Sequence, residues 1–277
     1  MTNMWPCRQS QLPLAYMKNI LQENVFRPDG IWLGMEYRQN LNLLKATKIL
    51  LVIFAGLFPP GLLYAGDAGT WYMGTDAGVN LQQTTFTAFP TSPAYPFLPV
   101  GETKFRPGER IDLKVGYNVK SWWATELEAG YIYNGISSIG SEPVSGVGFT
   151  QFPIMANVIF SRLVSRGWSV YAGAGLGGIV SQWNCGIKGP IRGFPYPPTF
   201  GLGATDTETD CVFGYQAIAG IKYVLSGNWD FSVGYQFLAT TAGHDWKVNN
   251  WNFPGNNTIT MDSTMSHSIV AALTFTF

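Results

Sequence analysis

Apolar and polar residues alternate along most of the chain after residue 66, and no helical period of useful length appears there. The clearest case is the segment ERIDLKVGYNV at 109–119. Every odd-numbered residue from Ile111 to Val119 is apolar, and the residues between them are charged, polar or glycine. Because the side chains of a strand point alternately to opposite faces, this period of two predicts strands rather than helices.

The same alternation recurs in seven further stretches of the chain, although the first of them is less regular. The predicted strands lie within 70–81, 109–119, 123–134, 151–163, 168–180, 211–224, 229–239 and 261–277. Each is close to the ~9–11 residues that a tilted strand needs to cross a bilayer.

The connections between these segments alternate in length. The long ones, at 82–107, 135–150, 184–210 and 241–260, are rich in Pro, Gly, Asn and Thr, whereas those near 120–121, 165–167 and 226–228 are short. Long loops at one end and tight turns at the other are typical of an outer-membrane barrel. We therefore predict an all-β fold: an eight-stranded antiparallel up-and-down transmembrane β-barrel with four long outer loops and three short periplasmic turns.

A soluble β-sandwich or lipocalin-like barrel remains the alternative, because alternation does not show which face points inward. Two features favour the membrane barrel. Glycines are frequent on the polar face, which suits the crowded lumen of a small barrel. Aromatic residues gather at the segment ends, where lipid headgroups would lie. The predicted interface aromatics are Trp71, Tyr72, Trp122, Trp123, Trp168 and Trp229.

Composition agrees with this choice and narrows the possible functions. The chain of 277 residues has a formal net charge of +0, only 12% charged residues, 15% aromatic residues and 32 glycines. So few charges are unusual for a soluble enzyme. Because the sequence has no basic block, we expect no nucleic-acid partner.

The N-terminal region has the layout of an export signal. Lys45 and Lys48 precede an apolar run at 49–63, and small residues follow around Ala65. We predict a signal peptide at 45–65, cleaved after Ala65, with an uncleaved anchor as the alternative. Residues 1–44 form an N-terminal extension that we expect to be untranslated or removed, with Met35 as a natural start. The barrel then occupies 66–277.

Several motifs resemble a known family. The stretches WYMGTDAGVN, KVGYNVKSWWATELEAGYIYN, VYAGAGLGGIV, FGYQAIAGIKYVLSGNWDFSVGYQFL and ALTFTF are similar to small outer-membrane β-barrel proteins of Gram-negative bacteria, the OmpA-like and opacity-type barrels. The resemblance implies an integral outer-membrane protein in contact with outer-membrane lipid. It also implies that the terminal aromatics Phe275 and Phe277 are read by the outer-membrane assembly machinery.

Five charged residues share the polar face of two consecutive predicted strands: Arg110, Asp112, Lys114, Glu126 and Glu128. Charges inside a narrow lumen must pair. They form either an ion-paired plug, which we favour, or a gate in an ion path. Lys114 with Glu126 or Glu128 is the expected pair.

Catalysis, cofactors and metals have little support. The two histidines stand beside possible partners, as His244-Asp245 and His267-Ser268, but neighbouring residues on a strand point to opposite faces. We therefore predict no catalytic residue and no enzyme activity. No His or Cys stands near Cys185 or Cys211 at ligand spacing, so we expect no metal and no cofactor.

In an exported chain, two cysteines are read first as a disulfide, here Cys185 with Cys211 across a loop of about 26 residues. The loop sequences at 87–108 and 244–258 mix Pro, Asn and aromatics. Those aromatics either contact a host or surface ligand or pack on the barrel rim. The predicted function is an envelope-structural, adhesin-like barrel. The alternatives are a narrow channel for small or hydrophobic solutes and a lipid-modifying enzyme.

Overall fold

The computed structural model describes residues 68–88, 101–140, 142–144, 146–185, 209–247 and 258–277. The predicted extension at 1–44 and signal peptide at 45–65 lie outside these residues, so both stay predictions. The described residues form strands and turns. Within them, no helix is long and apolar enough to cross a membrane.

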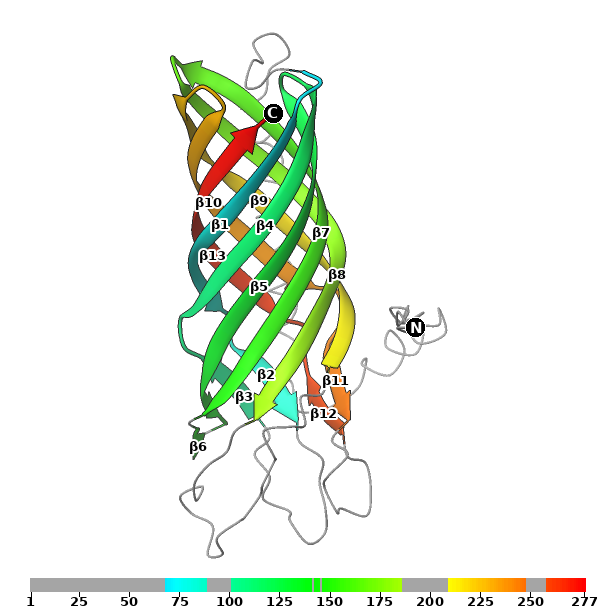
Figure 1. Ribbon diagram of the computed structural model, residues 1–277. Helices are drawn as coiled ribbons and strands as arrows, with labels where there is room; N and C mark the ends of the chain where they lie inside the picture. Colours follow the sequence, from blue (N-terminus) through cyan, green and yellow to red (C-terminus); the bar gives the residue numbers. More distant parts are fainter. Residues whose placement is uncertain (1–67, 89–100, 141, 145, 186–208, 248–257) are drawn as a thin grey trace, which may run out of the picture. The chain divides into compact units, whose positions relative to one another are not determined.

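Eight long strands pair in a closed antiparallel ring (Figure 1). In ring order they are β1 (Trp71–Gln82), β4 (Gly108–Lys120), β5 (Trp123–Ile139), β7 (Val147–Ser165), β8 (Trp168–Cys185), β9 (Thr209–Ser226), β10 (Trp229–Thr240) and β13 (Met265–Thr276). The first and last strands close the ring through a register that runs from Tyr72 opposite Thr276 to Gln82 opposite Ser266. The predicted eight-stranded up-and-down barrel is confirmed.

The wall of the barrel continues past one end of this ring. Five short strands form there: β2 (Thr85–Ala88), β3 (Gly101–Phe105), β6 (Glu142–Pro143), β11 (His244–Lys247) and β12 (Thr258–Met261). They lie at the end opposite the short turns (bottom of Figure 1). Four of them pair in the order β11–β12–β2–β3–β5, and β6 pairs separately with β5. We call β2, β3, β11 and β12 the collar. The segments 82–107 and 241–260 are therefore partly strand rather than loop throughout. The predicted long loop at 135–150 is also mostly strand, because β5 extends to Ile139, β6 follows, and β7 begins at Val147.

The two faces of the wall have opposite chemistry. On β4, Leu113 is 65% exposed on the outside, whereas Arg110 and Asp112 are completely buried inside. The same alternation holds on β5, where Leu127 faces outward and Glu128 inward. Large apolar side chains thus cover the outer surface, and polar side chains occupy the interior. This distribution is the reverse of that in a soluble protein and suits a surface that faces lipid.

Glycines on the inner face make room for tyrosine rings that lie flat against the wall. A Cβ at Gly116 would overlap the ring of Tyr72. Gly220 and Gly234, which are paired across β9 and β10, both lie under the hydroxyl of Tyr171. The excess of glycine on the polar face therefore has a packing cause, since any side chain there would displace a ring from the lumen.

Aromatic pairs surround the end of the ring that carries the short turns. Trp71 packs on Tyr117 at 5.1 Å between ring centroids, and Trp229 packs on Phe275 at 5.0 Å. Trp168 packs on Tyr223 at 4.7 Å, while Trp122 contacts both Trp123 and Phe160.

Tyr72 does not belong to this outer set, and its prediction as an interface aromatic is wrong. Its side chain is buried in the lumen, and its hydroxyl contacts Glu126. The reason is the strand period itself: Trp71 points outward, so its neighbour must point inward.

Candidate functional site

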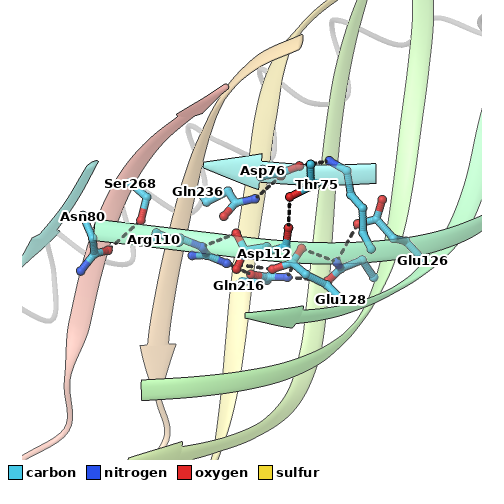
Figure 2. Close-up of polar contacts among 12 residues, drawn as sticks. Thr75, Asp76, Asn80, Arg110, Asp112, Glu126, Glu128, Gln216, Gln236 and Ser268 are labelled. Carbon is cyan, nitrogen blue, oxygen red and sulfur yellow. Dashed lines mark hydrogen bonds and ion pairs between the residues drawn. The ribbon is translucent and has the colours of Figure 1, made fainter. Parts of the chain in front are cut away.

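A layer of charged side chains crosses the middle of the lumen (Figure 2). Arg110 is its centre. Its Nε lies 2.7 Å from Asp112 Oδ2, and its Nη2 lies 2.8 Å from Glu128 Oε1. Arg110 and Asp112 are 0% exposed and Glu128 is 1% exposed. Adjacent strands β4 and β5 hold these groups, with Arg110 and Asp112 two residues apart on one face. We call Arg110, Asp112 and Glu128 the lumen plug.

Neutral side chains from β7 and β9 form hydrogen bonds with the lumen plug. Asn157 on β7 donates to Glu128 Oε2 at 3.1 Å. Gln216 on β9 donates to the same carboxyl at 3.3 Å and to Asn157 at 2.7 Å. These contacts span the interior from β4 to β9, so side chains rather than open space occupy the barrel axis at this level.

Lys114 pairs with a residue that the sequence analysis did not select. Its Nζ lies 2.6 Å from Asp76 Oδ1 on β1, whereas the predicted partner was Glu126 or Glu128. Glu128 does stand directly opposite Lys114 in the β4–β5 register, but the lysine side chain turns to its other neighbouring strand. Asp76 lies on the polar phase of β1, and that phase was the signal that could have identified it.

Glu126, the remaining predicted lumen carboxyl, is held by neutral groups. Tyr72 donates its hydroxyl to Oε2 at 3.1 Å, and Asn157 donates to Oε1 at 3.1 Å. All five predicted lumen residues therefore point inward. Four of them, Arg110, Asp112, Glu126 and Glu128, are linked by their own ion pairs and by Asn157, whereas Lys114 pairs with Asp76.

A cavity of about 90 Å³ lies between the lumen plug and the short turns. Charged groups in its lining include Lys114, Asp76 and Glu126, together with the pair Lys222–Asp230 at 3.4 Å. On the other side of the plug, the lumen contains buried polar side chains, such as Asn80, Asn134 and Ser268, and an apolar layer. The buried side chains of the apolar layer are Ile132, Met155, Ile179, Val212 and Leu238.

Inside the collar, a second apolar cluster contains Phe149, Trp183 and Trp246 with Ile and Met side chains around them. Trp246 is 1% exposed and donates its ring N–H to the carbonyl of Ser181 at 3.3 Å. This aromatic of the 244–258 segment therefore packs on the barrel instead of extending toward a partner.

The two histidines lie in different surroundings. His244 is buried in the collar, where its Nδ1 lies 2.8 Å from Ser181 Oγ and 3.4 Å from Asp210 Oδ2. Ser181 and Asp210 thus both lie at Nδ1 of His244. In a catalytic triad the serine and the aspartate bind opposite ring nitrogens, so these residues do not form one. His267 lies on the outer face between Tyr235 and Gln83.

The disulfide prediction depends on two residues at the outer ends of β8 and β9. Cys211 stands opposite Val180, whereas Cys185 lies five residues further along β8, opposite Val147 of β7. Cys211 is disulfide-bonded. The side chain of Cys185 lies outside the described residues, so its pairing with Cys211 stays a prediction.

Phe275 and Phe277, the predicted assembly signal, lie on the outer surface at the turn end. Their rings stack at 6.3 Å with an interplanar angle of 21°. Recognition by the assembly machinery stays a prediction.

The closed antiparallel ring, the apolar outer face and the polar interior define a transmembrane β-barrel. The family model described as "Outer membrane protein beta-barrel domain" matches residues 50–260, and the chain belongs to this family. It is an integral outer-membrane protein of the small eight-stranded type.

Solved structures resemble the chain in fold. The outer membrane protein OprG from Pseudomonas aeruginosa has a TM-score of 0.50 and 12% identity, with 76% of this chain and 98% of that chain covered. Neisserial surface protein A has a TM-score of 0.44 and 14% identity, with 76% and 99% covered. AlkL has a TM-score of 0.46 and 13% identity, with 79% and 95% covered. No curated protein matches the sequence.

Proposed function

We propose that this protein is a structural barrel of the outer membrane that carries binding loops on the cell surface. The filled lumen is the observation that carries the proposal. Arg110, Asp112 and Glu128 occupy the centre of the barrel, and the apolar layer next to them is buried. A barrel of eight strands has an interior that side chains can fill, so this arrangement favours support over conduction.

The collar supports the surface-binding part of the proposal. Its strands continue the wall beyond the ring, and Trp246 and Phe149 pack inside it. Segments 89–100 and 248–257 join the collar strands β2 to β3 and β11 to β12. A packed base of this kind limits the entropy that attached loops lose when they bind a host or environmental ligand.

Two measurements test this function together. In planar lipid bilayers, the purified protein should give no steady conductance above the lipid background. Cells that display the protein should bind a surface ligand, and replacement of 89–100 and 248–257 by short Gly-Ser linkers should abolish that binding while the folded protein remains in the membrane. Steady conductance, or binding that survives the loop replacement, would contradict the proposal.

Passage of small apolar solutes is a second candidate, and one feature of the wall favours it. The β5–β7 pairing stops after the pair Ala129 and Ile154, and it resumes at the pair Ile132 and Gln151. Pro153 lies in this interval and has no N–H to donate. The buried apolar layer, including Ile132 and Met155, lies inside the same part of the wall. If solutes pass through the wall at this interval, Pro153→Val should restore a backbone donor there and slow the uptake of an apolar dye into proteoliposomes. Equal uptake by the variant and the wild-type protein would exclude this route.

We also propose that residues 45–65 direct export and are removed, and that the barrel contacts outer-membrane lipid and the assembly machinery. N-terminal sequencing of the protein isolated from the outer-membrane fraction should begin after Ala65. A mature N-terminus within 1–64 would contradict this processing.

A further inference from the structure

The barrel interior contains more acidic than basic side chains. In the described part of the lumen around the plug, four carboxyl groups, those of Asp76, Asp112, Glu126 and Glu128, share the space with two basic groups, Arg110 and Lys114. Lys222 and Asp230 near the cavity mouth add one charge of each sign. Burial of a carboxylate without a counter-charge is costly, so the excess of negative charge has to be neutralised.

The excess negative charge lies on the cavity side of the plug. Arg110 forms ion pairs with Asp112 and Glu128, and Lys114 forms an ion pair with Asp76 at 2.6 Å. Among the described residues, no basic group forms an ion pair with Glu126, whose oxygens accept hydrogen bonds from the neutral Tyr72 and Asn157. Lys114 interacts electrostatically with Glu126 as well as with Asp76, so two carboxylates share one ammonium group. Glu126 lines the cavity of about 90 Å³, which has room for several water molecules.

A second, independent group in the same cavity also lacks a partner. Gln236 is 2% exposed and donates its Nε2 to Asp76 Oδ2 at 3.3 Å (Figure 2). Its carbonyl oxygen Oε1 is buried without a hydrogen-bond partner among the described residues. Buried polar atoms normally have a partner, so this amide oxygen is available to accept a hydrogen bond or to bind a cation. Gln236 and Glu126 both belong to the cavity lining.

We propose that this cavity binds one small monovalent cation, which enters from the end with the short turns. The Glu126 carboxylate and Gln236 Oε1 supply oxygen ligands, and water completes the coordination. The described residues contain no group of three or more His, Cys, Asp or Glu side chains suited to a metal ion, so a carboxylate-rich divalent site does not fit. One carboxylate with neutral oxygens and water suits a monovalent ion.

The test compares sodium chloride with N-methyl-D-glucamine chloride at equal ionic strength, using the folded protein extracted in detergent. The readout is the midpoint temperature at which the folded band disappears from unheated gels. Bulk screening is the same in both salts, so a specific site alone separates them. At a sodium concentration ten times the dissociation constant, the midpoint should rise by about 3 to 6 °C. Equal midpoints in the two salts overturn the proposal.

Glu126→Gln is the diagnostic variant, because it removes the unpaired charge and keeps groups that can bond to Tyr72 and Asn157. The sodium effect should disappear in it. Glu109→Gln is the matched control, since Glu109 lies on the outward-facing phase of β4, and it should keep the full effect. If Glu126→Gln retains the sodium effect, the site is wrong. A wild-type midpoint that rises with acidification and ignores the cation also overturns the site, in favour of a protonated carboxyl.

Discussion

Arg110 is the residue on which the interior of this barrel depends most. Its guanidinium contacts Asp112 and Glu128 while none of the three is open to solvent. Removal of the cation would leave two buried carboxyl groups facing each other. The loss of one member of a buried ion pair is far more damaging than the loss of all members together.

Arg110→Met should therefore lower the free energy of unfolding by about 3–5 kcal/mol. Adding Asp112→Asn and Glu128→Gln in the same chain should recover much of that loss. The measurement is urea unfolding in detergent micelles or lipid vesicles. Arg106→Met is the control, because Arg106 is exposed, and it should change stability by less than about 0.5 kcal/mol. An Arg110 variant as stable as this control would show that the plug does not hold the barrel together.

The contact between Tyr72 and Gly116 predicts a non-additive pair of substitutions. Gly116→Ala places a methyl group where the tyrosine ring lies, so it should displace Tyr72 from Glu126 and destabilise the barrel. In a Tyr72→Ala background the same change should cost much less, with a coupling of about 0.5–3 kcal/mol. A double-mutant cycle in urea unfolding measures this coupling, and additive effects would contradict the packing.

The sequence predicted most inward-facing residues but not their partners. The phase of alternation places Arg110, Lys114 and Glu126 in the lumen, because one strand determines it. Which carboxyl pairs with Lys114 depends on the rotamer of a long side chain that lies between two neighbouring strands. Asp76 lies 38 residues before Lys114 in the chain, so sequence spacing does not reveal the contact. Tyr72 shows the same limit, since its aromatic type suggested an interface and its phase decided otherwise.

At the level of elements, the collar is the part that the sequence analysis missed. Its strands have four or five residues each, so alternation is too short to separate them from loops. Their stability comes from pairing with one another and from the aromatic cluster beneath them. The long strands, by contrast, repeat their alternation often enough for the pattern to identify them.

Trp246→Ala should open the collar without unfolding the ring. Trp246 is fully packed between Phe149, Trp183 and His244, and its loss creates a cavity with a cost of about 3–5 kcal/mol. We expect faster cleavage of 248–257 by protease added to intact cells, with the folded band on unheated gels preserved. Asp245→Asn, an exposed position on the same strand, is the control and should leave cleavage unchanged.

The C-terminal end of β13, at the short turns, provides a separate prediction about assembly. Phe277→Ala should reduce the amount of folded protein in the outer-membrane fraction more than it reduces total synthesis, if the terminal aromatic is the recognised group. Leu273→Ala is the matched control, because Leu273 is also an outward-facing apolar residue of β13. Equal yields for the two variants would mean that Phe277 acts only as another lipid-facing side chain.

At the scale of the whole barrel, the eight described ring strands form a cylinder that is closed by hydrogen bonds between β1 and β13, with no open edge within the ring. Every strand of the ring has two partners, so unfolding must break two ladders at once. The folded protein should therefore resist detergent at room temperature and migrate differently before and after heating on detergent gels. A single band position under both conditions would contradict a closed ring.

The collar also has a practical consequence for protein engineering. Foreign peptides inserted within 89–100 or 248–257 would be joined to short strands that are already paired and packed, several residues away from the membrane-spanning ladder. A change in length there does not shift the register of β1, β4, β10 or β13, which is determined by their own pairings. The barrel should consequently serve as a scaffold for the display of antigens or affinity tags on bacterial cells.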